Sequence, residues 1–312
     1  KRQGLEMLNH SARPGIRALL SESGALGKRV SASTVGFTLA PRLNAAGRLG
    51  HADVAARLLL TRDEDEAARL AAELCRLNRE RQEIEHGIYE EARELLSAER
   101  PTEPIVLAAE GWHQGVIGIA ASKLAEEFSL PAVVLAKDKD GNWKGSARSP
   151  EGFMLKEALD QCAEYLISYG GHAKAAGLTV RAADLEKFKE KLTKLALEAA
   201  GDKGFEVAIP IDAVLGARDY TEDMVRHLGI LEPFGEGFRQ PLFGLIADNI
   251  TGVRYMGAED QHVKYQDESG LQVIQWNKGD EAKARKTPPK KFVGYPGLNV
   301  FRGNTTVQFI AE

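Results

Sequence analysis

The longest regular pattern of apolar residues lies between residues 61 and 98 and has the period of an α-helix. Its apolar positions are Leu70, Leu74, Leu77, Ile84, Ile88 and Leu95. Residues 61–64 read Thr-Arg-Asp-Glu, a capping-box sequence in which Thr61 would cap the helix. Such a helix would be about 50 Å long, so we expect it to connect two domains. A coiled coil is the alternative, but the apolar seam is short and is interrupted at Arg81.

Strand and helix patterns alternate in the segment that follows, residues 100–203. Strands are predicted at 105–109, at 132–136, around Trp143 and at 177–180, and helices at 116–128, 153–168 and 183–199. This alternation predicts an α/β domain with a mixed sheet.

The two ends of the chain have different patterns. Residues 204–312 contain about five strand patterns and a short helix near 221–228, which favours a small all-β barrel such as an OB-fold. Residues 1–60 contain short helical stretches and a segment at 38–50 that we interpret as a loop. The expected fold class is therefore α/β plus all-β, with domains at 1–60, 61–99 (the connecting helix), 100–203 and 204–312.

Three glycine-rich segments carry the candidate chemistry: 111–118 (GWHQGVIG), 145–149 (GSARS) and 170–177 (GGHAKAAG). Glycine lets backbone N–H groups approach an anion closely, and an arginine offers a two-pronged donor for phosphate. The first segment also lies between a predicted strand and a predicted helix, where the helix N-terminus favours anions. The alternative is a set of ordinary turns. No G-x-G-x-x-G or P-loop spacing is present, so a nucleotide cofactor is not expected.

A second candidate region is basic. Between Trp276 and Lys291, six Lys or Arg residues stand against two acids, Asp280 and Glu281. This run either follows a phosphate backbone or is a solvated loop.

Composition limits the function classes. The net charge of −4 excludes wholesale coating by nucleic acid, so any such contact must be local. No apolar run approaches the ~20 residues of a membrane span. Two cysteines, Cys75 and Cys162, lie in helical patterns and are expected to be reduced core thiols of a cytoplasmic protein. The chain begins at Lys1 without methionine, inside a helical pattern, and we interpret it as a fragment of a longer protein.

These segments together resemble motifs of the RecJ family, single-strand-specific exonucleases of the DHH phosphoesterase superfamily. The matching motifs are PRLNAAGR at 41–48, the three glycine-rich segments, LEPFGEG at 231–237 and HVK at 262–264. They occur in order along the whole chain. The resemblance implies a long helix that joins a catalytic DHH domain to a DHH-associated domain, followed by an OB-fold. It also implies hydrolysis of single-stranded DNA from the 5′ end with two Mn²⁺ or Mg²⁺ ions.

The chain departs from the family pattern at the metal site. It contains no Asp-His-His triplet and no adjacent pair of histidines. A two-metal site needs several converging oxygen and imidazole ligands. We therefore expect the catalytic domain and its metals to be absent from this chain, which alone would be inactive. The alternative is a non-catalytic single-stranded-DNA-binding or scaffold protein of a replication or repair complex.

The resemblance also assigns roles to particular residues. The expected partner is single-stranded DNA, with a single-strand-binding protein and a helicase as further candidates, and the expected state is a monomer. In the α/β domain, Arg148 with Ser146 is the candidate for binding the 5′-terminal phosphate. The remaining candidate phosphate-binding residues are Arg42, Asn44, Arg48, His113, Ser149, Gly170, Gly171, His172 and Lys174. A nucleic-acid groove in the last domain would contain Lys264, Lys278, Lys283, Arg285, Lys286, Lys290 and Lys291.

Overall fold

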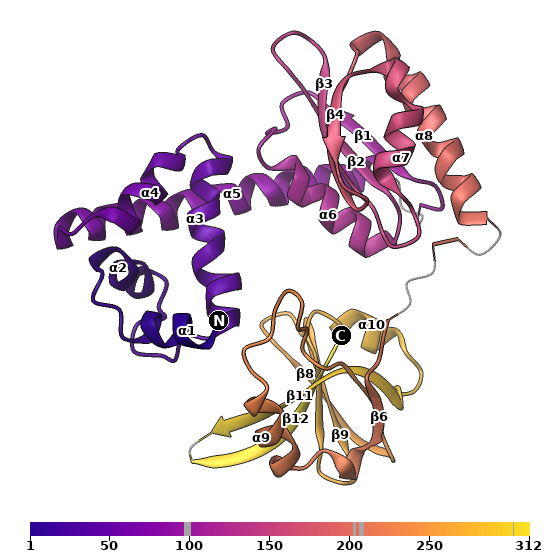
Figure 1. The fold of residues 1–312 in the computed structure, drawn as a ribbon. Helices are drawn as coiled ribbons and strands as arrows, with labels where there is room; N and C mark the ends of the chain where they lie inside the picture. The colour runs from indigo at the N-terminus through magenta and orange to yellow at the C-terminus, as the bar shows by residue number, and fades with distance from the viewer. Residues whose placement is uncertain (97–100, 202–203, 206–208, 302) are drawn as a thin grey trace. The chain divides into compact units, whose positions relative to one another are not determined.

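The protein is described from a computed structural model that covers residues 1–96, 101–201, 204–205, 209–301 and 303–312 (Figure 1). The chain divides into two compact units, one formed by residues 6–208 and the other by residues 209–312 together with residues 1–5. The first unit contains the helical region, the long helix and an α/β domain, and the second is mostly β-sheet.

The long helix predicted from the apolar period is present as α5, Glu64–Leu95. Its 32 residues extend about 48 Å at 1.5 Å per residue. The cap is Asp63 and not Thr61, because the Asp63 carboxylate accepts a hydrogen bond from the Glu66 amide at 2.6 Å. The Thr61 hydroxyl instead donates to the Glu66 side chain at 2.6 Å.

Short helices pack on the first half of α5. They are α2 (Pro14–Glu22), α3 (Ala40–Arg48) and α4 (Ala52–Leu60). The helix α1 (Arg2–Asn9) precedes them in the chain, and the π-helix η1 (Thr34–Leu39) continues directly into α3. Their shared core includes Leu19, Ala45, Leu58, Leu74 and Leu77. The predicted loop at 38–50 was wrong, because most of it is the helix α3. Pro41 is the second residue of α3 and directly follows η1, so the helical backbone continues through the proline.

The α/β domain is a five-stranded mixed sheet in the order β1-β2-β3-β5-β4. The strands are β1 (Ile105–Ala109), β2 (Ala132–Lys137), β3 (Trp143–Arg148), β4 (Leu166–Gly171) and β5 (Ala175–Val180). Strands β1 and β2 are parallel, and the other neighbours are antiparallel. The helix α6 (Ile117–Phe128) and the second half of α5 share a core with one side of this sheet. The helices α7 (Leu155–Gln161) and α8 (Leu185–Ala200) pack on the other side.

One predicted helix of this domain was too long. Helix α7 ends at Gln161, and after the 3₁₀ turns η2 (Ala163–Tyr165) the chain enters the edge strand β4. Another 3₁₀ turn, η3 (Ala182–Asp184), precedes α8. The helical pattern of 153–168 therefore runs into a strand, and the hairpin pairing of that strand with β5 overrides the local helix preference. Both cysteines are buried and free, as predicted, and burial raises the pKa of Cys162 to about 11.

The second unit contains a seven-stranded sheet in the order β6-β7-β11-β12-β10-β9-β8, rather than about five strands. The strands are β6 (Ala213–Gly216), β7 (Phe243–Ile246), β8 (Ile250–Met256), β9 (His262–Asp267), β10 (Gln272–Gln275), β11 (Lys291–Phe301) and β12 (Asn304–Ala311). Segments outside the sheet are η5 (Ala217–Asp219), α9 (Glu222–Ile230) and α10 (Gly279–Ala284). The apolar run 242–256 contains two strands, which accounts for part of the difference. The buried core includes Tyr220, Tyr265, Val273 and Phe309.

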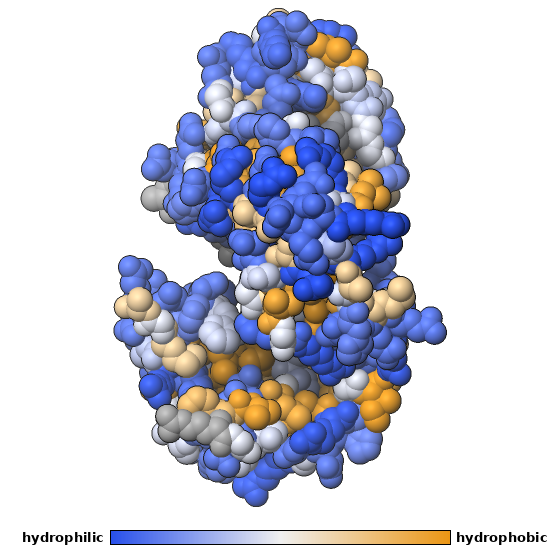
Figure 2. Space-filling view, turned by 90° about the vertical axis from the view of Figure 1, so that its left-hand side faces the viewer, coloured by the Kyte–Doolittle hydropathy of each residue, from blue (hydrophilic) through white to orange (hydrophobic). Residues whose placement is uncertain are grey.

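Within the described residues, no helix has the length and apolar character that a membrane span requires. On the face drawn in Figure 2, hydrophilic residues predominate and apolar residues are interspersed among them.

Candidate functional site

Arg148 lies at the end of β3 with its guanidinium half-buried. Its Nη1 donates to the Ser146 hydroxyl at 2.9 Å and to the Ala147 carbonyl at 2.8 Å. Among the described residues, no carboxylate forms an ion pair with Arg148. Burial lowers the pKa of this arginine, and the nearby positive charge of Arg48 lowers it further. A guanidinium in these surroundings gains from an anion, because charges of its own sign are near and opposite charges are not.

Arg48 reaches the same place from the last turn of α3. Its Nη1 donates to the Gly115 carbonyl at 3.2 Å. The two backbones are so close that a Cβ added at Gly115 would lie 2.1 Å from the Arg48 carbonyl oxygen. Gly115 is therefore required for the C-terminus of α3 to contact the loop before α6. This contact joins residues 67 positions apart in the sequence.

The first turn of α6 lies against Ser146 and Arg148. A Cβ added at Gly118 would be 2.9 Å from the Ser146 hydroxyl and 3.3 Å from an Arg148 nitrogen. The amide end of a helix carries partial positive charge. Two guanidinium groups and a helix N-terminus therefore meet at one place, and this arrangement suits a phosphate group.

His113 precedes this helix and is partly buried. Its Nδ1 accepts a hydrogen bond from the Gly115 amide at 3.1 Å. In the neutral ring the proton then resides on Nε2, which is left as a donor. His113 is therefore positioned by the same loop that Arg48 contacts.

A strip of small residues extends across the sheet from Ser146. Ser146 pairs with Gly177 of β5, and Gly177 pairs with Gly170 of the edge strand β4. Residues paired in this way point to the same face of a sheet. A Cβ added at Gly170 would meet nothing within 4 Å, and one at Gly177 would lie 4.0 Å from its nearest neighbour. Protein packing therefore does not require glycine at either position, and the strip is open for a ligand beside Arg148.

The other residues of the GGHAKAAG segment form the turn between β4 and β5. Gly171 has φ +152°, and a Cβ there would lie 2.3 Å from the Ala175 carbonyl oxygen, so this glycine is required by the turn. The His172 amide donates to the same carbonyl at 2.8 Å, and the His172 side chain is exposed. Lys174 is exposed and forms an ion pair with Glu151 at 2.7 Å, which lowers the pKa of that carboxyl.

Within the described chain, no hydrogen bond or ion pair joins the next three predicted site residues to Arg48 or Arg148. The Ser149 hydroxyl donates to the Phe153 carbonyl at 3.0 Å. Arg42 lies on α3 and donates to the Thr38 carbonyl at 2.6 Å, and its buried Nε has no hydrogen-bond partner within the described part of the chain. Asn44 is exposed on the same helix.

Most of the basic residues predicted for the groove lie on the segment between β10 and β11, which contains the unpredicted helix α10, whereas Lys264 lies in β9 and Lys291 begins β11. Lys278 pairs with Glu281 at 2.5 Å, Lys283 pairs with Asp260 at 3.3 Å, and Lys264 donates to Gln272 at 3.4 Å. The others are exposed: Arg285, Lys286, Lys290 and Lys291. These basic residues therefore remain candidates for contacts with nucleic acid.

Sequence reasoning missed two contributions to the site. Gly118 and Gly177 belong to motifs that were recognised, but their spatial role depends on which strand and helix they face. The signal that could have found them is a glycine inside a predicted helix or strand. Glycine weakens such an element, so its presence there indicates that another group or a ligand approaches the backbone closely.

Comparison with known proteins agrees with this architecture. Residues 102–198 match the DHHA1 domain model, and residues 211–312 match the RecJ OB domain model. The chain is 39% identical over 284 residues to the single-stranded-DNA-specific exonuclease RecJ of Bacillus subtilis. The aligned region covers 89% of this chain and 36% of that protein. It is 37% identical over 305 residues to the Thermus thermophilus protein of the same name, covering 97% of this chain and 43% of the relative.

A solved structure is also similar. The crystal structure of RecJ from Thermus thermophilus in complex with Mn²⁺ superposes with a TM-score of 0.84 at 32% identity, covering 99% of this chain and 45% of that one. This chain thus spans less than half the length of these relatives. The DHHA1 and RecJ OB domains, together with these similarities, show that the chain belongs to the RecJ family of the DHH superfamily.

Proposed function

We propose that this chain is the substrate-binding part of a RecJ-like 5′-to-3′ exonuclease for single-stranded DNA. The observation that supports it most is the pair Arg48 and Arg148, which lie near each other at the N-terminus of α6 with no carboxylate paired to Arg148 among the described residues. Keeping like charges close costs free energy. An anionic substrate would offset that cost.

The charge of this centre favours a terminal phosphate over an internal one. A phosphate monoester carries close to two negative charges at neutral pH, whereas a phosphodiester carries one. Arg148, Arg48 and the helix end would interact more strongly with the larger charge. We therefore propose that Arg148 and Ser146 bind the 5′-terminal phosphate, with the Nε2–H of His113 as a further donor.

The strip formed by Ser146, Gly177 and Gly170 would hold the nucleotides that follow. It is flat because neither glycine has a side chain, and it begins beside Arg148. A single strand can lie on such a surface with its sugars against the sheet. The exposed His172 and Lys174 are near the end of the same strip and would contact the next phosphates.

The metal chemistry of the family does not fit this chain. RecJ of Thermus thermophilus was solved with Mn²⁺ and with Mg²⁺. Over the ranges that the structure describes, no group of three or more His, Cys, Asp or Glu side chains could hold a metal ion. We therefore propose that this chain supplies substrate contacts and that the metal ligands belong to another part of the enzyme.

It follows that the isolated chain should not hydrolyse DNA. We expect no release of nucleotides from single-stranded DNA with or without Mn²⁺, because two-metal catalysis needs ligands that these residues do not provide. The measurement is product formation from labelled DNA by the pure chain. Metal-dependent release that a chelator abolishes would show this expectation to be wrong.

The same isolated chain should still bind single-stranded DNA, more tightly than duplex DNA. Its phosphate contacts release counterions, so we expect affinity to fall steeply as salt rises from about 50 to 200 mM. Titration of labelled single-stranded and duplex oligonucleotides at several salt concentrations measures this. Equal affinity for both, or no salt dependence, would argue against phosphate contacts and in favour of a scaffold protein.

A further inference from the structure

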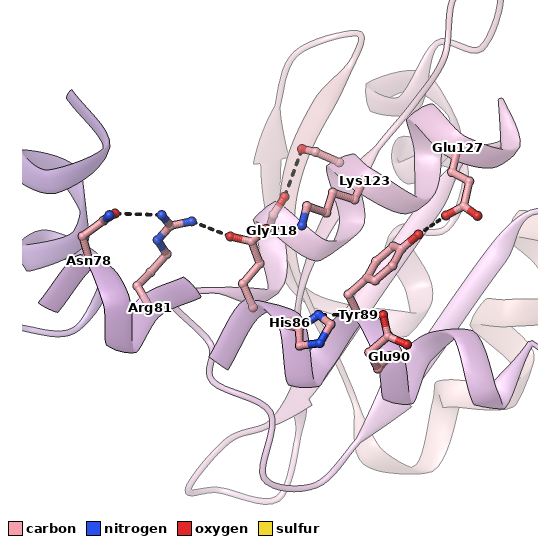
Figure 3. Close-up of polar contacts among 10 residues, drawn as sticks. Asn78, Arg81, His86, Tyr89, Glu90, Gly118, Lys123 and Glu127 are labelled. Atoms are coloured by element: carbon pink, nitrogen blue, oxygen red, sulfur yellow. Dashed lines mark hydrogen bonds and ion pairs between the residues drawn. The ribbon is translucent and has the colours of Figure 1, made fainter. Parts of the chain in front are cut away.

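The middle of α5 carries a largely buried cluster of charged and polar side chains that the phosphate site does not use directly. It consists of Asn78, Arg81 and Glu85 of α5 and Lys123 of α6, and is called the junction cluster below (Figure 3). One Glu85 oxygen accepts from Arg81, and the other is 2.6 Å from the Lys123 nitrogen. Arg81 also donates to the Asn78 side chain at 2.7 Å. Asn78 and Glu85 are each 6% exposed.

Such a cluster contributes little to stability. Removing charges from water costs several kcal/mol per ion, and the attraction between them at best offsets this cost. A buried charged group can instead specify one arrangement of two helices, because its hydrogen bonds are directional whereas apolar contacts are not.

The surfaces that meet here need such specification. The apolar contact between α5 and α6 involves Ile88 and Ala92 on one side and Ala120, Ala121 and Leu124 on the other. Faces made largely of alanine are smooth and fit one another in more than one register. Further toward the C-terminus of α5, Tyr89 and Arg93 both donate to Glu127 of α6. Side-chain hydrogen bonds between the two helices therefore recur along their contact.

The junction cluster also has a particular place along α5. The core that α5 shares with α3 ends at Leu77, and the core that it shares with α6 includes Ile88. The cluster lies between these two cores. Arg48 is therefore placed by the first half of α5, and Gly118, which contacts Arg148, is placed by the second half.

From this arrangement we infer that the junction cluster is a positioning device for the phosphate site. Glu85 holds Lys123, and with it α6, at one position along α5. That position sets the first turn of α6 and Arg148 at the correct separation from Arg48. Asn78, Arg81, Glu85 and Lys123 act through the site and do not touch the DNA. This inference rests on the proposed phosphate-binding function.

Lys123 is the residue to change, because its side chain is 49% exposed and its loss leaves Glu85 paired with Arg81. Lys123→Met keeps most of the side-chain length and removes the charge, and Lys123→Arg restores a cation. Lys156 supplies a matched control. It pairs with Asp160 at 2.5 Å and lies 5.3 Å from the Tyr169 ring, much as Lys123 pairs with Glu85 and lies 5.4 Å from the Tyr89 ring. Lys156 is on α7, which packs on the other side of the sheet.

Two readouts test the inference on the pure chain. The first is the ratio of affinities for 5′-phosphorylated and 5′-hydroxyl single-stranded DNA. The second is hydrogen exchange of the amides in the first two turns of α6. We expect Lys123→Met to lower the ratio at least about fivefold and to speed this exchange. Lys123→Arg and Lys156→Met should leave both readouts close to those of the unmodified chain.

The inference requires that Lys123 acts through Arg148. In an Arg148→Ala background, Lys123→Met should therefore cause no further loss in the ratio. An additive loss, an equal loss for both DNA ends, or unchanged exchange in α6 would overturn it. If the unmodified chain shows no preference for a 5′-phosphate, the proposed function fails instead. The exchange measurement alone then decides whether Lys123 positions α6.

Discussion

Replacing Arg148 with alanine should lower kcat/KM of a RecJ enzyme that contains this chain roughly 30- to 150-fold. This corresponds to a loss of about 2–3 kcal/mol in transition-state stabilisation. The loss is this large because a charge-assisted contact to phosphate disappears from a partly desolvated position. It should fall on substrates with a 5′-phosphate and spare those with a 5′-hydroxyl. Kinetics on the two kinds of end, with a melting curve for each variant, measure the effect.

Arg148→Lys should be almost as damaging. An ammonium group cannot reproduce the planar two-pronged donor that a phosphate binds. Arg181 is a suitable control, because it lies just after β5 and donates to the Glu164 carbonyl at 2.5 Å, so Arg181→Ala should leave the end preference unchanged. If Arg148 merely tethers β3 through Ser146 and Ala147, its variants will melt earlier and lose activity equally on both ends.

Replacing Gly115 with alanine should separate α3 from the loop before α6. The added Cβ would lie 2.1 Å from the Arg48 carbonyl oxygen, and because that atom is backbone it cannot move away alone. We expect a loss of about 1–3 kcal/mol in the free energy of unfolding, which lowers Tm by about 2–4 °C per kcal/mol. Because Arg48 moves with α3, affinity for 5′-phosphorylated DNA should fall about tenfold as well.

Gly87 provides the matched substitution. It lies in α5 with nothing within 4 Å of an added Cβ, so Gly87→Ala should raise stability by up to about 1 kcal/mol. Calorimetry and DNA titration of both variants separate the specific clash from the general effect of removing a glycine. A Gly115→Ala protein with unchanged Tm and unchanged affinity would mean that α3 and this loop do not need the contact.

Elements with a clear period were predictable from the sequence. Apolar residues every three or four positions indicated α5 over nearly its whole length, and β1 and β2 were indicated by short apolar runs. These elements are specified by local pattern and burial. The helix α3 was missed because Pro41 and Asn44 are typical of loops, although the helical backbone of η1 continues through Pro41 into α3.

The geometry of the site was less accessible. The sequence indicated the segments that contain Ser146, Arg148 and Gly170, but not that Ser146, Gly177 and Gly170 form one row across three strands. That row depends on strand register, which pairings between distant residues decide. The contact of Arg48 with Gly115 likewise depends on how α3 and α6 both pack on α5. Arg81 appeared in the sequence only as an interruption of an apolar seam, and its buried partner Glu85 was not recognised.

The most direct test of the account is equilibrium binding of the unmodified chain to two single-stranded oligonucleotides that differ in one group, a 5′-phosphate or a 5′-hydroxyl. Both share the internal phosphates, so their difference reports the terminal group alone. The account predicts tighter binding of the phosphorylated strand by about tenfold or more, the worth of one charge-assisted contact. This preference should disappear in Arg148→Ala. Equal affinity of the unmodified chain for both strands would contradict a terminal-phosphate site at Arg148.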